Sequence, residues 1–401
     1  MDVSSPALDP TKVGPDLPLD GILVVSLEQA VAGPYATRQL ADLGARVIKV
    51  ERPGRGDFAR DYDGTVRGLS SHFVWVNRSK ESLVLDLKSQ AGKAALQGLV
   101  GRADVLLSNL RPGALARLGF EPSELRVAHP RLVVCTITGF GPRGPYRDRR
   151  AYDLLVQCEA ALLAVTGTPE APAKVGIPVA DIAAATHAFA GILAALYRRE
   201  RTGQGAHVEV SLLDSLAEWM GYPLYYTAYG GEPPTRSGSH HAAIAPYGPF
   251  RARDGAVVFL AVQNQGEWER LCSRVLQMTE LARDPRFASN SDRAANSTSL
   301  QAIIESCFAS WSGPEVEEKL EAAGVASARL RSVEELLEHP QLRARRRWQT
   351  VQSPAGELFA LTPPIGIDGT PTRMGPVPAL GEHTSAILAE LESPVPGRSP
   401  E

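Results

Sequence analysis

Hydrophobic and polar positions along the first half of the chain change repeatedly between two spacings. Short apolar runs predict buried strands at residues 21–25, 45–51, 83–87, 103–107 and 132–137. Stretches with helical spacing separate them, at residues 33–44, 90–100 and 113–118. Because strands that alternate with helices form parallel sheets, this half is predicted to be a doubly wound α/β domain.

A long helix rich in alanine follows, and an aspartate stands at its start. Residues 182–200 predict the helix, and residues 202–205, with two glycines, predict its end. Asp181 is therefore expected at or near the N-cap. A capping aspartate contributes about 1 kcal/mol. The same position suits a nucleophilic carboxylate, because the helix N-terminus favours the ionised form that a nucleophile requires. The sequence leaves both roles open.

The second half changes in composition. A further strand is predicted at 207–213, and an aromatic-rich stretch leads into a segment rich in Gly, Pro and Ser. Beyond it, a hairpin is expected at 247–260, helices at 265–276, 300–310 and 313–323, irregular chain from Pro354, and a closing helix at 384–392. We expect a large Rossmann-like domain over 1–229 to which 335–401 returns, a linker over 230–244, and a small α+β domain over 245–334.

Composition and charge exclude several classes of protein. A chain of 401 residues exceeds what one hydrophobic core usually serves. The net charge of -3 argues against a general nucleic-acid binder. Four separated cysteines fit a reducing compartment. The polar leader does not resemble a signal peptide, and no stretch approaches the roughly 18 apolar residues of a membrane span. A soluble, cytoplasmic protein is expected.

Resident cofactors and metals are not predicted. The loop after the first strand, residues 26–33, lacks the G-x-G-x-x-G that lets a backbone approach a pyrophosphate, which disfavours nicotinamide and flavin chemistry. His240 and His241 have no third ligand at metal spacing, so no metal site is predicted.

Basic residues gather after three of the predicted strands. They are Lys49 and Arg52, then Arg111 and Arg117, then Arg143, Arg147, Arg149 and Arg150. The carboxyl ends of parallel strands border the ligand crevice, so cations from several loops suit a polyphosphate. A solvated surface position is the alternative for each arginine taken singly. Asn109 follows a strand too, and either fixes a ligand amide or ribose hydroxyl or forms a turn before Pro112.

Two further residues accompany Asp181. Asp153 either positions a catalytic carboxylate or caps a helix. His187 is six residues beyond Asp181, which places it on another face of the helix, so a packing role is favoured.

Eight short motifs occur in order along nearly the whole chain. They cover residues 32–34, 47–54, 109–113, 139–141, 150–153, 179–181, 201–205 and 379–384. Together they resemble the type III CoA-transferase family, which also contains formyl-CoA:oxalate transferases and α-methylacyl-CoA racemases. The resemblance implies an interlocked homodimer of ring-shaped subunits, with the active site between domains of different subunits. It also implies that the partners are acyl-CoA thioesters and small carboxylic acids, used as substrates.

The resemblance assigns roles to particular residues. It makes Asp181 the nucleophile, which forms a mixed anhydride and then an aspartyl-CoA thioester, with Asp153 and Tyr152 as candidate supporting residues. Positions matching the CoA site are Arg52, Asn109, Leu110, Arg111, Arg117 and Arg150. A glycine-rich covering loop is not evident, and residues 247–249 occupy its general region.

Two alternatives to a transferase stay open. In the racemases of this family a histidine precedes the aspartate that matches Asp153, whereas this chain has Tyr152. A phenol with a pKa of about 10 is a poor proton shuttle at neutral pH, so transfer is favoured over racemisation or epimerisation. A non-catalytic acyl-CoA binding protein would keep the arginines but would have no need of Asp181.

The acceptor is the least defined feature. Residues 236–248 resemble the branch of the family that acts on C4 and C5 dicarboxylates such as itaconate, mesaconate, citramalate or malate, with succinyl-CoA as a usual donor. Arg236, His240 and His241 are candidates to pair with the distal carboxylate. A flexible linker with incidental histidines is the alternative.

Overall fold

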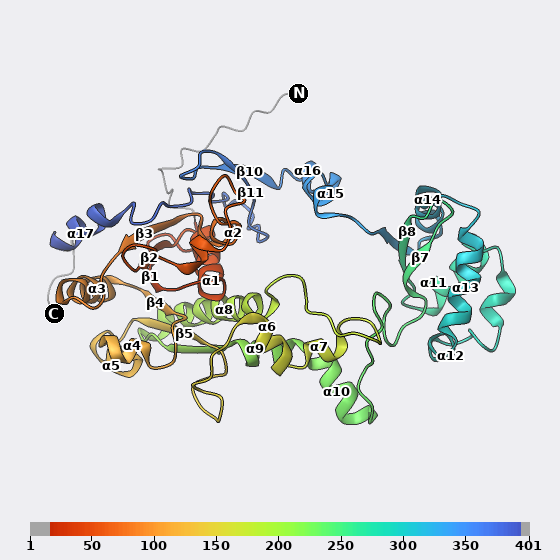
Figure 1. Cartoon of the computed structure of the whole chain (residues 1–401), viewed down its shortest axis with the longest axis horizontal. Helices are drawn as coiled ribbons and strands as arrows, with labels where there is room; N and C mark the ends of the chain where they lie inside the picture. Colours follow the sequence, from red (N-terminus) through yellow and green to blue (C-terminus); the bar gives the residue numbers. More distant parts are fainter. Residues whose placement is uncertain (1–16, 394–401) are drawn as a thin grey trace. The chain divides into compact units, whose positions relative to one another are not determined.

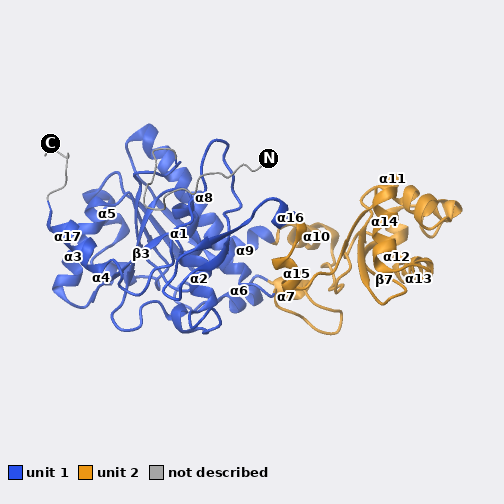
Figure 2. Ribbon diagram, turned by 90° about the horizontal axis from the view of Figure 1, so that it is seen from above, with its two compact units in different colours: residues 1–160, 176–219, 341–401 blue, residues 161–175, 220–340 orange. Residues whose placement is uncertain are grey.

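The computed structural model describes residues 17–393, and two compact units are distinguished in it (Figure 2). The first unit contains the described residues within 1–160, 176–219 and 341–401. The second unit contains residues 161–175 and 220–340, so it interrupts the first unit twice. The leader that bears on a signal peptide, residues 1–16, lies outside the described residues.

A six-stranded sheet forms the centre of the first unit. Its order is β3-β2-β1-β4-β5-β6, and every neighbouring pair is parallel. The strands are β1 (Leu23–Leu27), β2 (Arg46–Glu51), β3 (Lys80–Val84), β4 (Val105–Ser108), β5 (Val133–Thr138) and β6 (His207–Ser211). The predicted doubly wound parallel sheet is confirmed. The strand expected at 83–87 is wrong in position, because β3 begins three residues earlier, at Lys80.

Helices cover both faces of this sheet (Figure 1). On one face lie α1 (Ala32–Asp42) and α8 (Val179–Thr202). On the other lie α3 (Gln90–Arg102), α4 (Ala114–Leu118), α5 (Pro122–Ala128) and α17 (Thr384–Glu392). Since side chains alternate along a strand, Ile48 and Val50 enter the core against α3, whereas Lys49 between them points to the α1 face. The parallel strands bring all their carboxyl ends to one edge.

Helix α8 is a core helix. Among residues 17–393 it is the one helix long and apolar enough to cross a membrane, so the expectation that no stretch approaches that length was wrong. Half of its most apolar window is buried, and the helix packs against α1, β5 and β6. Its end is as predicted, because Gly203 adopts φ +72° and its N–H bonds the Arg199 carbonyl.

Shorter elements complete the first unit. They are a 3-10 turn (Phe58–Asp61), α2 (Ser71–Asn77), α6 (Asp153–Glu159), α9 (Leu212–Trp219) and the antiparallel pair β10 (Trp348–Val351) and β11 (Leu358–Leu361). The irregular chain expected from Pro354 was wrong at β11. Its pattern is weak because Phe359 and Leu361 are exposed and only Leu358 is buried.

The second unit contains a three-stranded antiparallel sheet, in the order β7-β8-β9. Its strands are β7 (Tyr247–Arg251), β8 (Val257–Ala261) and β9 (Ala326–Arg329), and β7 with β8 confirms the predicted hairpin. The larger helices are α11 (Gln265–Arg270), which continues as a wider turn (Leu271–Val275), α12 (Asn290–Ala295), α13 (Ser297–Phe308) and α14 (Gly313–Ala323). Buried Trp268, Phe287 and Phe308 anchor their shared core. Shorter segments are α7 (Leu162–Val165), α10 (Gly221–Gly230), a 3-10 turn (Thr279–Arg283), α15 (Val333–Leu337) and α16 (Pro340–Ala344), which runs on into the first unit.

Candidate active site

Asp181 lies in the first turn of α8, at the edge where the strands of the sheet end. Near the other end of α8, Arg199 pairs with Asp104 at 2.8 Å, and Asp104 precedes β4. The helix therefore begins at the carboxyl edge, where ligands of open α/β sheets bind. The carboxylate of Asp181 is partly buried and makes no hydrogen bond or ion pair within residues 17–393. An unpartnered, partly buried carboxylate is available for chemistry.

Asp181 lies near the N-cap as predicted, but of the two roles that the sequence left open it does not perform capping, because another aspartate caps the helix. The N-cap position is Pro178, and Asp181 is the third helical residue. Asp153, 27 residues earlier than Ala180, accepts the Ala180 N–H at 2.8 Å with Oδ1. Its Oδ2 accepts Gln157 Nε2–H at 2.6 Å. Asp153 is therefore fixed on both sides, joins α6 to the start of α8, and leaves Asp181 free.

The two carboxylates are electrostatically coupled. Burial and the negative charge of Asp153 raise the pKa of Asp181 to about 7. The helix N-terminus favours the ionised form, but these two effects are stronger. A carboxylate that titrates near neutral pH is more basic than an ordinary aspartate, and it is a stronger nucleophile once ionised.

The Asp153→Asn variant is expected to move the acidic limb of the kcat/KM profile to lower pH. Asparagine keeps an oxygen for the Ala180 N–H and removes the charge that raises the pKa of Asp181. The measurement is kcat/KM between pH 5 and pH 9 for both proteins, a range of about two units on each side of the pKa.

Glu159→Gln is the matched control, because Glu159 lies on the same helix, is exposed, and within the described part of the chain pairs with Arg149 alone, at 3.4 Å. Its profile should match that of the wild type. An Asp153→Asn profile that coincides with the wild-type profile would contradict the coupling.

One tyrosine, Tyr62, interacts electrostatically with Asp181, and another, Tyr152, directly precedes Asp153. Burial, together with the acidic groups of Asp57, Asp181 and Tyr152, raises the pKa of Tyr62 to about 12, so its phenol stays protonated at neutral pH. Tyr152 is the N-cap residue of α6 and is 62% exposed. The sequence drew attention to Tyr152 and missed Tyr62, which follows a 3-10 turn and belongs to no repeated pattern. His187 packs edge-on against Trp219, as expected for a packing residue.

A glycine explains the position of the segment that carries Asp153. A Cβ on Gly139, just after β5, would overlap the Ala151 side chain. The absence of a side chain therefore lets the loop after β5 lie directly against Ala151 and brings Tyr152 and Asp153 to the sheet edge. This contact gives the motif at 139–141 a steric reason.

The predicted cations do follow the ends of β2, β4 and β5, which share one edge of the sheet. Arg52, Arg111, Arg117 and Arg150 are exposed, and none of them forms an ion pair in the described part of the chain. Arg52 donates Nε–H to the Gly56 carbonyl at 2.9 Å. Lys49 does not belong to this group, because its ammonium is fully buried and pairs with Asp57 at 2.7 Å. Its expected phosphate role is therefore wrong.

Asn109 has a structural role in the loop between β1 and α1. Its Oδ1 accepts the Gln29 N–H and its Nδ2 donates to the Gln29 carbonyl, both at 2.8 Å. A Cβ on Gly33 would lie 3.1 Å from Asn109 Cγ, so this glycine makes room for the amide. The neighbouring Leu110 N–H bonds Ser108 Oγ. The second Nδ2–H of Asn109 makes no hydrogen bond within residues 17–393.

A group of titratable side chains beneath this loop was not predicted from the sequence. It consists of four fully buried side chains, Glu28, Lys49, Asp57 and Lys80, which we call the buried charge cluster. Burial lowers the pKa of Lys80 to about 7, although Glu28 attracts its charge. Burial would also lower the pKa of Lys49, but Asp57 and Glu28 outweigh it and raise that pKa. A lysine inside the apolar run of β2 was the signal, since such a charge requires a partner.

The second unit contains a polar pocket of about 340 Å³. His240, His241, Tyr247 and Gln301 are among its lining residues. His241 stacks on Tyr247 at 5.2 Å, and its Nδ1 accepts the Ala243 N–H, which leaves Nε2–H as a donor. Arg236 does not line the pocket, because it donates to the carbonyls of Thr168 and Pro169.

Comparison with known proteins identifies the family. The family model described as CoA-transferase family III matches residues 19–384. The chain belongs to CoA-transferase family III. This CoA-transferase is 37% identical to an acetyl-CoA:oxalate CoA-transferase of Acetobacter aceti, over 96% of this chain and 98% of that protein. It is also 37% identical to a succinate–glutarate CoA-transferase of Agrobacterium fabrum, over 94% and 96%.

Solved structures agree with this placement of the CoA-transferase. A CAIB/BAIF family protein from Brucella suis is 34% identical and superimposes with a TM-score of 0.82, over 94% of this chain and all of the other. A hypothetical protein from Mycobacterium tuberculosis is 29% identical, with a TM-score of 0.82 over 92% of this chain and 99% of the other. A relative from Haloarcula hispanica, 35% identical over 93% of this chain and 96% of that protein, is a succinyl-CoA:mesaconate CoA-transferase.

Proposed function

We propose that this CoA-transferase moves CoA from succinyl-CoA or another dicarboxylyl-CoA to a small carboxylate such as itaconate, mesaconate, citramalate or malate. The observation that carries the proposal is the unpartnered carboxylate of Asp181, whose pKa burial and Asp153 raise to about 7. The names of relatives that act on oxalate, glutarate and mesaconate support a short diacid as one substrate.

The proposed reaction conserves the thioester bond in two symmetrical halves. Asp181 attacks the thioester carbonyl of the donor, which forms a mixed anhydride and releases CoA thiolate. The thiolate attacks the Asp181 carbonyl, which forms an aspartyl-CoA thioester and releases the donor acid. The acceptor carboxylate attacks that thioester, which forms a second mixed anhydride and releases CoA thiolate. The thiolate then attacks the acceptor carbonyl of this anhydride, which forms the acceptor's CoA thioester and restores the Asp181 carboxylate. No proton or water is consumed in the sum.

Each neighbour of Asp181 has a task in this scheme. Asp153 fixes the first turn of α8 through the Ala180 N–H. The Tyr62 phenol, protonated at neutral pH, interacts electrostatically with Asp181, and we propose it as a hydrogen-bond donor to the charge that develops during thioester attack. Hydrolysis would waste the intermediate, so the site must also exclude water.

We propose that the cations at the carboxyl edge bind the phosphates of CoA. Arg52, Arg117 and Arg150 are exposed there without ion pairs in the described chain, and Arg111 and Leu110 lie beside Asn109 in the loop after β4. Guanidinium groups match phosphate oxygens in geometry and charge. We therefore propose these residues as the binding site of the polyphosphate that the sequence suggested.

We propose that the pocket of the second unit binds the distal carboxylate of the acceptor. Nε2–H of His241 is a donor there, and His240 and Gln301 add polar groups to the lining. A short diacid needs hydrogen bonds and positive charge for its second carboxylate in a partly dry site. Arg236 is occupied by two backbone carbonyls, which favours the histidines over it.

An interlocked homodimer and a cytoplasmic location complete the proposal. Helix α10 exposes Tyr225 and Tyr229 at 69% and 84%, and their rings stack at 6.1 Å. Clustered exposed aromatic side chains mark protein interfaces, which supports a second copy of the chain as their partner. The four cysteines are free, as a reducing cytoplasm requires.

The deciding experiment incubates the protein with succinyl-CoA and a panel of dicarboxylates in heavy water, with a chiral 2-methylacyl-CoA as a separate substrate. Mass spectrometry then identifies every CoA ester. We expect a new acyl-CoA whose mass names the acceptor, and an equal amount of succinate. Oxalate and glutarate belong in the panel because relatives act on them.

Two results would oppose the proposal in different ways. A 2-methylacyl-CoA that gains one deuterium without a change of ester would show racemisation instead of transfer. CoA esters that bind but never change would indicate a binding protein. A sample without the protein and a sample without acceptor are the controls for spontaneous exchange.

A further inference from the structure

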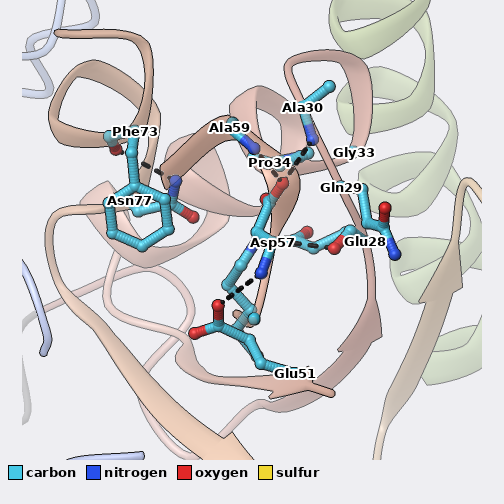
Figure 3. A network of polar contacts seen from close by, with 12 residues as sticks. Glu28, Gln29, Ala30, Gly33, Pro34, Glu51, Asp57, Ala59, Phe73 and Asn77 are labelled. Carbon is cyan, nitrogen blue, oxygen red and sulfur yellow. Dashed lines mark hydrogen bonds and ion pairs between the residues drawn. The ribbon is translucent and has the colours of Figure 1, made fainter. Parts of the chain in front are cut away.

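The loop between β1 and α1 has a strained turn that several side chains hold in place. Ala30 has φ +60°, a left-handed conformation that a residue with a Cβ rarely adopts. The Ala30 N–H donates to Asp57 Oδ1 at 3.0 Å, and the same oxygen accepts the Ala59 N–H at 2.9 Å. Figure 3 shows Asp57 between these two backbone groups. One carboxylate thus joins the loop after β1 to the 3-10 turn after β2.

Asp57 is in turn fixed by the buried charge cluster. Its Oδ2 accepts Lys49 Nζ–H at 2.7 Å, and its own N–H donates to Glu51 Oε2 at 2.9 Å. Lys49 also lies 3.5 Å from Glu28 Oε1, and Lys80 donates to that atom at 2.7 Å. The cluster contains two acids and two bases, and all four side chains are shielded from water.

The cluster therefore acts on two points of the same loop. Glu28 is the first residue of the loop and accepts hydrogen bonds from Lys80 and Thr37. The Ala30 N–H donates to Asp57. Between them, Asn109 holds both backbone groups of Gln29. Three consecutive residues of this loop are held in place, and one of them has a strained conformation. Such strain persists where the surrounding structure maintains it, and it is concentrated at functional sites.

The position of the loop in the sheet indicates a role in ligand binding. It follows the central strand β1, next to β4, at the point where the strand order reverses. Arg52 follows β2 and Arg117 follows β4 on either side of it. In open α/β sheets a ligand binds at this switch point.

We propose that Asp57, held by Lys49, is a positioning residue for CoA: it maintains the left-handed turn at Ala30 and so the shape of the loop that receives the nucleotide end of CoA. The inference rests on the proposed CoA site at this edge. Asp57 touches no substrate and acts through the backbone of Ala30.

The test measures equilibrium binding of CoA to the full-length protein by calorimetry, for Asp57→Ala, Ala30→Gly and the double variant. Asp57→Ala is expected to raise the Kd for CoA about tenfold, because the loop loses the group that holds its turn. Glycine adopts positive φ without strain, so in the double variant Ala30→Gly should restore most of the affinity for CoA that Asp57→Ala loses.

Asp42→Ala is the matched control. Asp42 is equally buried in the same unit and pairs with Arg78 at 2.8 Å, but it does not touch the loop. Its removal should lower Tm as much as Asp57→Ala does, while the Kd for CoA stays at the wild-type value. A merely structural role for Asp57 would make the two variants behave alike.

Ala30→Val tests the same idea without disturbing the buried charges. A β-branched residue resists positive φ, so the Kd for CoA should rise about tenfold or more in a folded protein. Wild-type affinity in Ala30→Val or in folded Asp57→Ala overturns the inference, and so does a double variant without recovery. Because CoA binding does not need Asp181, these outcomes are independent of whether transfer is found.

Discussion

Replacing Asp181 with asparagine is expected to lower kcat for CoA transfer by about 10⁴-fold or more, because an amide oxygen does not attack a thioester. The Kd for CoA should stay within about threefold, since the charge that is lost lies at the reacting carbon and not at the phosphates. Steady-state kinetics and calorimetry on the same preparations measure the two quantities.

A trapping experiment accompanies the kinetics. Wild-type protein incubated with donor acyl-CoA and no acceptor should carry CoA as a thioester on the peptide that contains Asp181, and the variant should carry none. Glu200→Gln, at the far end of the same helix, is the control and should retain full activity, because Glu200 is exposed and its ion pairs among residues 17–393 are with Arg131 and Arg199. A variant at Asp181 with kcat within about tenfold of the wild type would remove the nucleophile from the scheme.

The same substitution is expected to stabilise the fold above neutral pH. The pKa of Asp181 in the folded protein, about 7, lies above its ordinary value of 3.8. The contribution of Asp181 to stability is therefore fully present below about pH 4 and is lost as the pH rises through 7, where the unpartnered carboxylate becomes charged. Asp181→Asn should raise the free energy of unfolding by about 1–3 kcal/mol at pH 8 and leave it nearly unchanged at pH 4.

The second large effect concerns stability. Lys49→Met is expected to lower the free energy of unfolding by about 3–5 kcal/mol, because it leaves the buried carboxylates of Asp57 and Glu28 without their shared cation. Urea denaturation at pH 7.5 measures it. The exposed Lys88→Met is the control and should change stability by less than about 0.5 kcal/mol.

A double variant separates charge from packing. Lys49→Met with Asp57→Asn removes one charge of each sign, so its loss of stability should be smaller than the sum of the two single losses. Simple additivity would show that the two side chains do not act as a pair. That result would contradict the 2.7 Å ion pair as the reason for the burial of Lys49.

Much of the fold follows from hydrophobic spacing, and the exceptions share a physical cause. The parallel sheet, the long helix and the hairpin of the second unit were predictable because their apolar positions have the correct period. The start of β3 was not, because Lys80 is buried by its pairing with Glu28, 52 residues away in sequence. A polar residue that is buried through a distant partner looks exposed in the sequence.

The candidate site shows the same limit. Asp181 could be selected as a candidate nucleophile from its apolar neighbours, but the sequence left a capping role open, and the capping group comes from Asp153 on another helix. Lys49 was assigned to a phosphate because its partner Asp57 belongs to the following loop. Sequence spacing locates charged groups along the chain, and only the fold shows which of them neutralise one another.

The last helix has a consequence for synthesis of the protein. Helix α17 packs against α3 and β3 and contributes Ile387 to their core, yet residues 220–340, the larger part of the second unit, are made between β6 and α17. At a translation rate of about 5–20 residues per second, roughly 10–35 s pass between the end of β6 and the start of α17. During that time the nascent first unit has a complete sheet, but the apolar side chains that pack against α17 are uncovered. The synthesis of α17, and not the closing of the sheet, therefore completes the core of this unit.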